Sequence, residues 1–230
     1  MYWVQTKFRI VMLLFFALTS SVSIAQVNTQ ISIFPRWQDQ SLQENTWLPL
    51  VQTDSIQITQ LRFYISNISL FYKGRKVWSE PTSFHLVDLL EPSSFNLSLQ
   101  LPQNIEYDAL QFNVGIDSAT SVSGAMGGDL DPTKGMYWTW QSGYINFKLE
   151  ALTARQNQEL VYHIGGYQAP YNTLQEIQVR FEPNSNAKVY LQLDKFFEDM
   201  DCSKINHVMS PNASAMQLAR LLPNLFLLGK

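Results

Sequence analysis

The 230-residue sequence is poor in cysteine, in charge and in short catalytic motifs. Cys202 is its one cysteine, so no internal disulfide can form, and we expect this thiol to be buried and inert. Only 15% of the residues are charged, the formal net charge is −3, and no long basic run argues for a nucleic-acid partner. G-x-S-x-G, H-E-x-x-H and phosphate-loop patterns are absent. No hydrolase constellation therefore stands out in the sequence.

An apolar stretch stands at the N-terminus. Lys7 and Arg9 precede I-V-M-L-L-F-F-A-L, and Ser23-Ile24-Ala25 is a small-x-small cleavage site. This order predicts a signal peptide over residues 1–25 and a secreted or periplasmic protein, with an uncleaved anchor as the alternative. The apolar run is too short to span a bilayer, and no later segment is long enough for a span. Residues 26–230 are expected to form a single domain.

From residue 26 onward the sequence is strand-like. Large apolar residues alternate over 95–101 and again over 107–116, and the alternation changes parity at Ser66-Asn67, which predicts a bulge. Nine or ten short strands with turn signals between them predict an all-β fold, an antiparallel β-sandwich, with a closed barrel as the alternative. Residues 214–222, which Pro223 ends, predict one short C-terminal helix.

The segment 128–150 is the most distinctive, and reads G-D-L-D-P-T-K-G-M-Y-W-T-W-Q-S-G-Y-I-N-F-K-L-E. In a continuous strand, Trp138 and Trp140 would share one face and the apolar residues of 145–149 would occupy the other. A bulge near 142–143 would bring the two sets to the same face. Large aromatics in a sandwich core are the simplest interpretation of both tryptophans.

This segment resembles the signature of the MbnP-like copper-binding family, in its cysteine-poor branch. Further blocks are similar to the family in the same order: L-R-F-Y-I-S-N-I-S-L at 61–70, F-H-L-V-D-L at 84–89, F-N-V-G-I-D-S at 112–118, Y-H-I-G-G at 162–166 and H-V-M-S-P at 207–211. The resemblance implies a copper-binding β-sandwich that is not itself an enzyme and, as partner, a di-haem MauG-like peroxidase. It also implies that the partner oxidises a tryptophan to kynurenine, with Trp138 and Trp140 as the candidates. Indole is a poor metal ligand, whereas kynurenine offers a new nitrogen and a new oxygen.

Three histidines and one methionine are the candidate metal ligands. His163 lies in the family-like Y-H-I-G-G block, where Tyr162 and Ile164 share the opposite face, so a surface position is the alternative. His207 stands two residues before Met209, and imidazole with thioether suits copper, especially Cu(I). His85 is the weakest of the three, and Met209 can equally serve as core filler.

Two alternatives stay open at this stage. Asp117, Asp129 and Asp131, near a glycine-rich loop, can bind calcium or cap turns. Trp138, Trp140 and Tyr144 can instead form an exposed stacking platform in a structural or carbohydrate-binding sandwich. Copper binding predicts that at least one indole lies within about 8 Å of His163 or His207, the scale of diagonal neighbours in a sheet, whereas a platform predicts exposed, coplanar rings.

Overall fold

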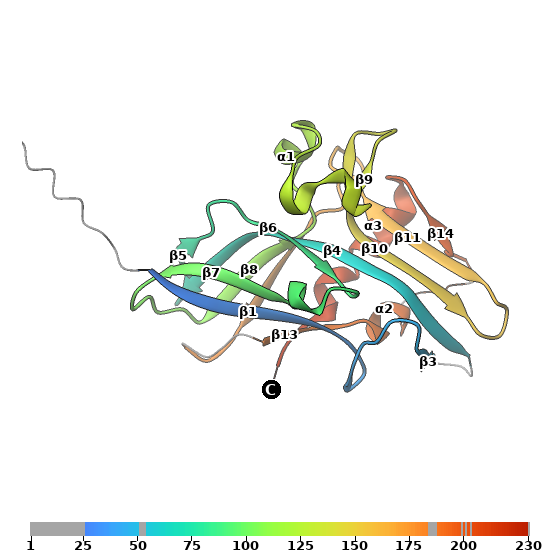
Figure 1. Cartoon of the computed structure of the whole chain (residues 1–230), viewed down its shortest axis with the longest axis horizontal. Coiled ribbons are helices and arrows are strands. Elements are labelled where there is room, and N and C mark those ends of the chain that lie inside the picture. Colours follow the sequence, from blue (N-terminus) through green and yellow to red (C-terminus); the bar gives the residue numbers. More distant parts are fainter. Residues whose placement is uncertain are drawn as a thin grey trace, which may run out of the picture.

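A computed structural model of the chain describes residues 26–50, 54–183, 188–198, 200, 202 and 204–229. The signal peptide predicted at 1–25 lies outside the described residues. Two β-sheets face each other across one main core (Figure 1). The smaller sheet has the order β15-β13-β1-β2, and β7 pairs with β1. Its strands are β1 (Gln26–Trp37), β2 (Gln40–Ser41), β7 (Asn96–Pro102), β13 (Lys188–Gln192) and β15 (Phe226–Leu228).

The larger sheet has the order β12-β8-β4-β10-β11-β14, and the long strand β4 also pairs with β3, β5 and β6. Its strands are β3 (Trp47–Pro49), β4 (Ser55–Tyr72), β5 (Arg75–Ser79), β6 (Phe84–Asp88), β8 (Ala109–Val114), β10 (Gly143–Thr153), β11 (Glu159–Gly165), β12 (Gln175–Arg180) and β14 (His207–Val208). A further short strand, β9 (Tyr137–Trp138), pairs with β10. The expected all-β sandwich is confirmed.

Two pairings depart from a purely antiparallel arrangement. β13 runs parallel to β1, and β14 runs parallel to β11. Each of these late segments joins its partner strand after a long excursion of the chain, and such crossovers allow the parallel orientation that a short hairpin forbids.

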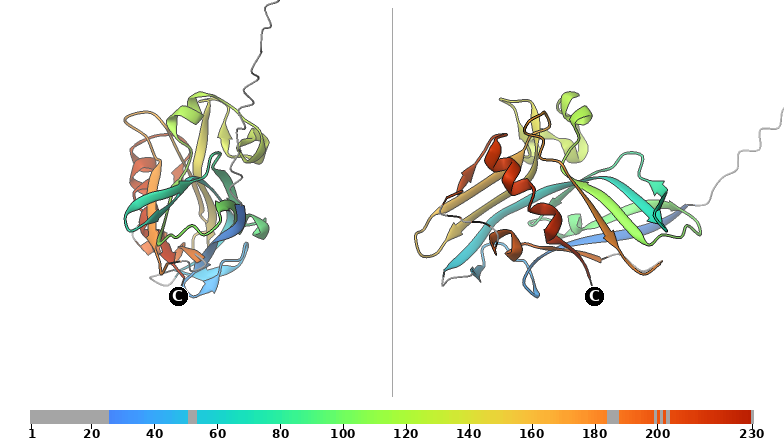
Figure 2. Two further views of the ribbon diagram at one scale, coloured as in Figure 1. Left: turned by 90° about the vertical axis from the view of Figure 1, so that its left-hand side faces the viewer. Right: turned by 180° about the vertical axis from the view of Figure 1, so that it is seen from behind.

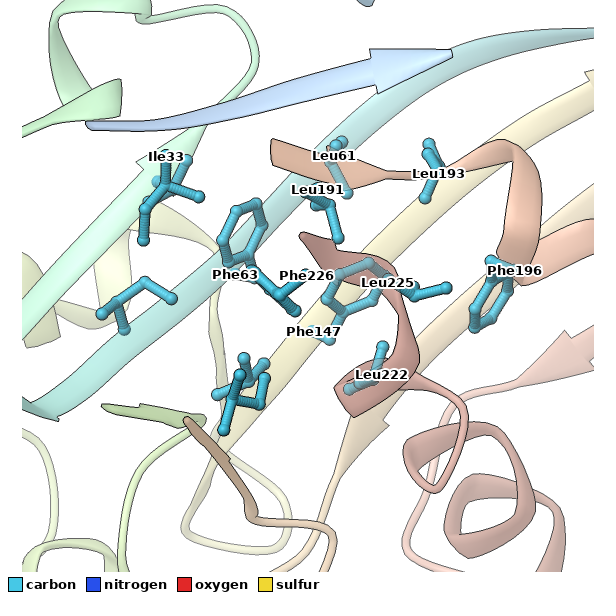
Figure 3. Packing of buried hydrophobic residues seen from close by; sticks show 14 of the residues in the cluster. Ile33, Leu61, Phe63, Phe147, Leu191, Leu193, Phe196, Leu222, Leu225 and Phe226 are labelled. Atoms are coloured by element: carbon cyan, nitrogen blue, oxygen red, sulfur yellow. The ribbon is translucent and has the colours of Figure 1, made fainter. Parts of the chain in front are cut away.

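The core between the sheets follows from alternation in the sequence. Along β7, Leu97, Leu99 and Leu101 are buried and the residues between them are exposed. Phe226 of β15 joins the two sheets, because its ring lies 6.1 Å from that of Phe63 on β4 (Figure 3). It also lies 5.4 Å from the ring of Phe112 on β8. Cys202 is half-buried and packs against this core. This thiol is therefore less buried than expected.

The predicted bulge in β4 is present. The pairing of β4 with β8 shifts register between Ser66 and Ser69, and Asn67 adopts a positive φ of 52°. A single left-handed residue of this kind turns the following side chains to the other face of the strand. The change of parity in the sequence therefore located this irregularity correctly.

The C-terminal helix is also present as α3 (Ala213–Ala219), capped by the side chain of Asn212. The structure adds two helices of five residues, α1 (Ser118–Val122) and α2 (Asp194–Glu198), which are too short to give a periodic pattern in the sequence. Short 3₁₀ segments complete the chain: η1 (Pro92–Phe95), η2 (Gly128–Leu130), η3 (Pro132–Lys134) and η4 (Leu222–Leu225). No helix in the described part of the chain is long and apolar enough to cross a membrane.

Candidate functional site

The two tryptophans lie in a hairpin that projects from the outer face of the larger sheet (Figure 1; Figure 2). Trp138 of β9 pairs with Gly143 of β10, and residues 139–142 form the turn, with a positive φ of 51° at Ser142. The expectation of one strand with both indoles on a shared face is therefore wrong, because the chain reverses at the residues expected to bulge. Trp138 is 5% exposed, whereas Trp140 on the turn is 64% exposed.

A bulge is present in β10, but it lies further along the strand than predicted and does not bring Trp138 to the face of Phe147 and Leu149. The pairing of β10 with β11 shifts register between Ile145 and Phe147, which sets Asn146 apart. Asn146 is buried; its Oδ1 accepts a hydrogen bond from the Ile116 N–H and its Nδ2 donates to Thr173 Oγ1, each at 2.9 Å. Because of this bulge, Ile145 packs with Trp138 on the outer face, while Phe147 points into the main core.

A second apolar cluster therefore lies on the outer face of the larger sheet. It consists of Tyr64, Leu86, Ile116, Leu130, Met136, Trp138, Tyr144 and Ile145. The Tyr144 hydroxyl holds the covering loop in place, since it accepts from the Met126 N–H at 3.1 Å and lies 3.2 Å from the carbonyl oxygens of Gly124 and Leu130. Burial raises the pKa of Tyr144, so the hydroxyl stays neutral.

The indole of Trp138 rests on Gly165, near the end of β11. A Cβ placed on Gly165 would stand 2.8 Å from Cη2 and Cζ3 of Trp138 and 2.7 Å from the Tyr144 carbonyl oxygen. The absence of a side chain at Gly165 therefore leaves the space that this indole occupies. Trp138 Nε1 is buried and has no hydrogen-bond acceptor among the described residues.

His163 lies two residues before Gly165 on the same face of β11, about 7 Å away along the strand. Tyr162 and Ile164 point into the main core, so the predicted outward orientation of His163 is confirmed. The alternative of a surface position is wrong, since His163 is only 7% exposed. Its Nε2 donates a hydrogen bond of 2.7 Å to Oε1 of Glu150 on the neighbouring strand.

The charges around His163 act in opposite directions. Burial lowers the pKa of His163 below its ordinary value of 6.5, and Lys148 and His207 lower it further, while Glu150 acts to raise it. Burial by itself would raise the pKa of Glu150, but the hydrogen bond from His163 and the charge of Lys148 outweigh it, and the net pKa is lowered. The resting pair is thus a neutral imidazole that donates to a carboxylate.

His207 joins the same face from the adjacent strand. In the parallel pair, His207 lies opposite Val161, which shares the outer face with His163. The chain then continues beside β11, because Pro211 reaches Gly166: a Cβ on that glycine would stand 3.0 Å from the Pro211 ring. Met209 lies between these two contacts and is 42% exposed.

The other predicted ligand, His85, lies elsewhere. It is on β6, which is separated from β11 by β4 and β10, and its Nε2 donates to Glu80 Oε2 at 2.8 Å. Its partner in the ladder is Ile65, a residue of the main core, so His85 has the parity opposite to that of His163. The structure therefore brings His163 and His207 together without His85.

A pocket of about 170 Å³ adjoins Trp138. It is lined by Trp138, Gln141, Gly143, Gly166, Tyr167, Gln168, Ala169, Tyr171 and Pro211. The turn of the tryptophan hairpin, the segment after β11 and the segment after β14 thus meet beside the indole.

Most of the described chain matches a known family. The family model described as MbnP matches residues 26–211. The chain belongs to the MbnP family. Among solved structures, MbnP from Methylosinus trichosporium superposes with a TM-score of 0.56 at 16% identity, covering 83% of each chain, which shows that the two share a fold. A search of curated proteins finds no significant match.

In this MbnP-family chain, two of the three aspartates near the glycine-rich loop cap short helices. Asp117 caps α1 through the Thr120 N–H, and Asp131 caps η3 through the Thr133 N–H. Asp129 accepts from Lys134 Nζ at 2.6 Å. Within the described ranges, no group of three or more His, Cys, Asp or Glu side chains is arranged to hold a metal ion. The turn-capping alternative thus describes Asp117 and Asp131, whereas Asp129 forms an ion pair with Lys134.

Sequence reasoning missed Glu150, Lys148 and Gly165 as residues of this site. Each of the three occupies an outward-facing position in a segment of alternating hydrophobicity. Residues at such positions usually face solvent, so the pattern did not mark them as part of a site. The relevance of the two charged residues depends on the register in which Lys148 lies opposite His163. The G-G of Y-H-I-G-G was the one available signal, because a glycine within a strand often marks the close approach of another group.

Proposed function

We propose that this chain is a copper-binding protein whose site lies on the outer face of β11. The proposal rests on three side chains that follow one another along that face, those of His207, His163 and Trp138. His207 lies beside Val161, His163 follows two residues later, and Trp138 lies on Gly165 two residues beyond. Members of the family resembled here bind copper, and this face brings together the side chains that such a site needs.

The donor chemistry fits copper. Two imidazoles from His163 and His207, with the thioether of Met209 nearby, are the nitrogen and soft sulfur donors that copper prefers. Glu150 supplies the outer hydrogen bond that a metal-bound histidine usually makes. Since Nε2 of His163 is committed to Glu150, Nδ1 is the nitrogen that would face the metal.

Trp138 is the proposed source of a further ligand. The indole N–H is only a donor and cannot bind a metal, and in this position it has no acceptor among the described residues. Oxidation to kynurenine opens the pyrrole ring and leaves an aryl amine and a ketone, both of which can donate electron pairs. We propose that a di-haem MauG-like peroxidase carries out this oxidation, as the family resemblance implies.

In this proposal, the protein is exported and has no enzymatic activity of its own. The basic, apolar and small-residue order of residues 1–25 supports export with removal of that segment. The partner enzyme would act on the folded chain, because Trp138 acquires its place on Gly165 only when β9, β10 and β11 have paired.

The stacking-platform alternative does not fit the arrangement of the aromatic rings. Trp138 is 5% exposed and Tyr144 is 1% exposed, so neither can stack on a sugar from solvent. The indoles of Trp138 and Trp140 are tilted by 43° and are therefore not coplanar. Trp140 alone remains exposed, and one ring is not a platform.

Co-expression with the partner peroxidase tests this function. Intact-mass and peptide mass spectrometry should show the loss of one carbon and the gain of one oxygen at Trp138, and copper should bind more tightly to the oxidised chain than to the unoxidised chain. Trp138→Phe should abolish both effects. Trp47→Phe, which alters an exposed tryptophan on β3, should leave them unchanged. Failure of the purified, oxidised protein to bind copper would contradict the proposal.

A further inference from the structure

The exposed tryptophan of the hairpin lies against the buried one. The ring centroids of Trp138 and Trp140 are 5.7 Å apart, which is within the range of aromatic rings in contact. Trp140 is 64% exposed at the tip of the hairpin, and Trp138 is 5% exposed beneath it. Solvent and any second protein can therefore reach one ring of the pair directly and the other hardly at all.

We propose that Trp140 is an electron relay through which an external oxidant withdraws an electron from Trp138. This inference rests on the proposed function, in which Trp138 is oxidised, and adds the route by which the electron leaves. The Trp140 indole lies against the reacting ring and is itself largely exposed at the surface. The oxidant then needs to contact the hairpin tip and not the buried indole.

The relay consists of two one-electron steps. In the first, a one-electron oxidant of the high-potential haem class takes an electron from Trp140, so that the oxidant is reduced by one electron and Trp140 becomes a radical cation. In the second, Trp138 passes one electron to Trp140, which returns to the neutral indole while Trp138 becomes the radical cation. No bond forms or breaks in either step, and both N–H protons stay in place.

The environments of the two rings explain the division of roles. Water solvates a positive charge on the exposed Trp140, whereas the same charge on buried Trp138 carries a desolvation cost. The radical cation therefore resides mainly on Trp140. Trp138 is consumed when the small population oxidised there reacts onward. The pocket beside Trp138, bordered by Gly143 and Gly166, gives small reactants access at that ring.

Substitutions at position 140 separate redox function from packing. Phenylalanine and tyrosine have nearly the same shape, but only tyrosine is readily oxidised. Full-length protein carrying Trp140→Phe, Trp140→Tyr or the control Trp47→Phe is exposed to photogenerated tris(bipyridine)ruthenium(III), a small one-electron oxidant. Oxidation at Trp138 is then followed by peptide mass spectrometry, and the radical by transient absorption. Circular dichroism establishes that each variant is folded.

The relay predicts a specific order of rates. Oxidation at Trp138 should fall by about tenfold in Trp140→Phe, equivalent to about 1.4 kcal/mol in the barrier. It should be largely retained in Trp140→Tyr and unchanged in Trp47→Phe. Equal rates in the wild type and Trp140→Phe, an equal loss in the Phe and Tyr variants, or no oxidation of Trp138 in the wild type would each overturn the relay.

Copper binding distinguishes this inference from the proposed function. Copper affinity is measured separately, on protein whose Trp138 has already been oxidised. If that protein binds no copper while the rate order holds, the proposed function fails and the relay stands. If copper binds and the rate order fails, only the relay is lost.

Discussion

The Trp138 indole lies directly on Gly165, so closely that no side chain fits between β11 and the ring. Gly165 has no positive φ, which means that space alone, and not backbone conformation, requires glycine there. The same glycine is two residues from His163 on the outer face of the strand. One small residue thus sets the position of the tryptophan relative to the histidine.

Gly165→Ala should therefore displace the indole and destabilise the fold. The added methyl group would stand 2.7 Å from the Tyr144 carbonyl oxygen and 2.8 Å from the Trp138 ring, and overpacking of this kind costs about 1–3 kcal/mol. Urea denaturation measures the change. Gly127→Ala is the matched control, because nothing lies within 4 Å of a Cβ there and φ is not positive. A loss of similar size in both variants would contradict the role given to Gly165.

Removal of His163 should weaken copper binding strongly, and removal of His85 should not. The two histidines are well matched, since each donates from Nε2 to a glutamate, at 2.7 Å to Glu150 and at 2.8 Å to Glu80. They differ in position, because only His163 lies on the face that carries His207 and Trp138. Isothermal titration of the oxidised His163→Ala and His85→Ala proteins with copper measures the difference. Equal affinities would remove His163 from the site.

Glu150→Gln should reduce copper affinity by about 10–100-fold, the usual effect of altering the outer partner of a metal-bound histidine. Glutamine keeps the size of the side chain and an oxygen that can accept from His163, but it removes the negative charge that makes the imidazole a better electron donor. Glu159→Gln, an exposed change on β11, the strand that carries His163, should have little effect. Competition with a chromophoric copper chelator gives both affinities, and unchanged binding in Glu150→Gln would exclude this carboxylate from the site.

The apoprotein should lose stability as the pH falls below about 6.5. Burial lowers the pKa of His163 in the folded state below the value of 6.5, so the unfolded chain binds the proton more readily. The stabilising contribution is therefore present above 6.5 and is lost as the pH falls toward the folded pKa. Lys148 and His207 act in the same direction, and Glu150 opposes them. Urea denaturation over a pH series measures the effect.

His163→Gln is the control for that pH dependence, since glutamine stays neutral throughout. The difference in unfolding free energy between the wild type and this variant should shrink as the pH is lowered through the window below 6.5. A difference that stays constant across the series would mean that His163 does not titrate differently in the two states.

Alternation along the sequence determined much of this protein. It was sufficient for the sandwich, for the bulge at Ser66-Asn67 and for the outward orientation of His163, because side-chain parity is a local property of the strand. The C-terminal helix was likewise predictable from apolar residues at helical spacing, although it ends at Ala219 and Pro223 lies within the 3₁₀ segment that follows. The resemblance of residues 128–150 and of the other blocks to the MbnP-like family agreed with the match of the family model to residues 26–211.

Only the tertiary structure determined which side chains gather on the outer face of β11. The hairpin turn that begins after Trp138 could not be predicted from the sequence. Ser142 in this turn adopts a left-handed conformation that serine seldom adopts. Nor does the sequence state which strands become neighbours, and only the pairing of β10, β11 and β14 brings Glu150, His163 and His207 together and leaves His85 apart. Consecutive residues determine which face of a strand a side chain occupies, whereas long-range strand pairing determines which side chains become neighbours. The candidate site depends on the long-range pairing.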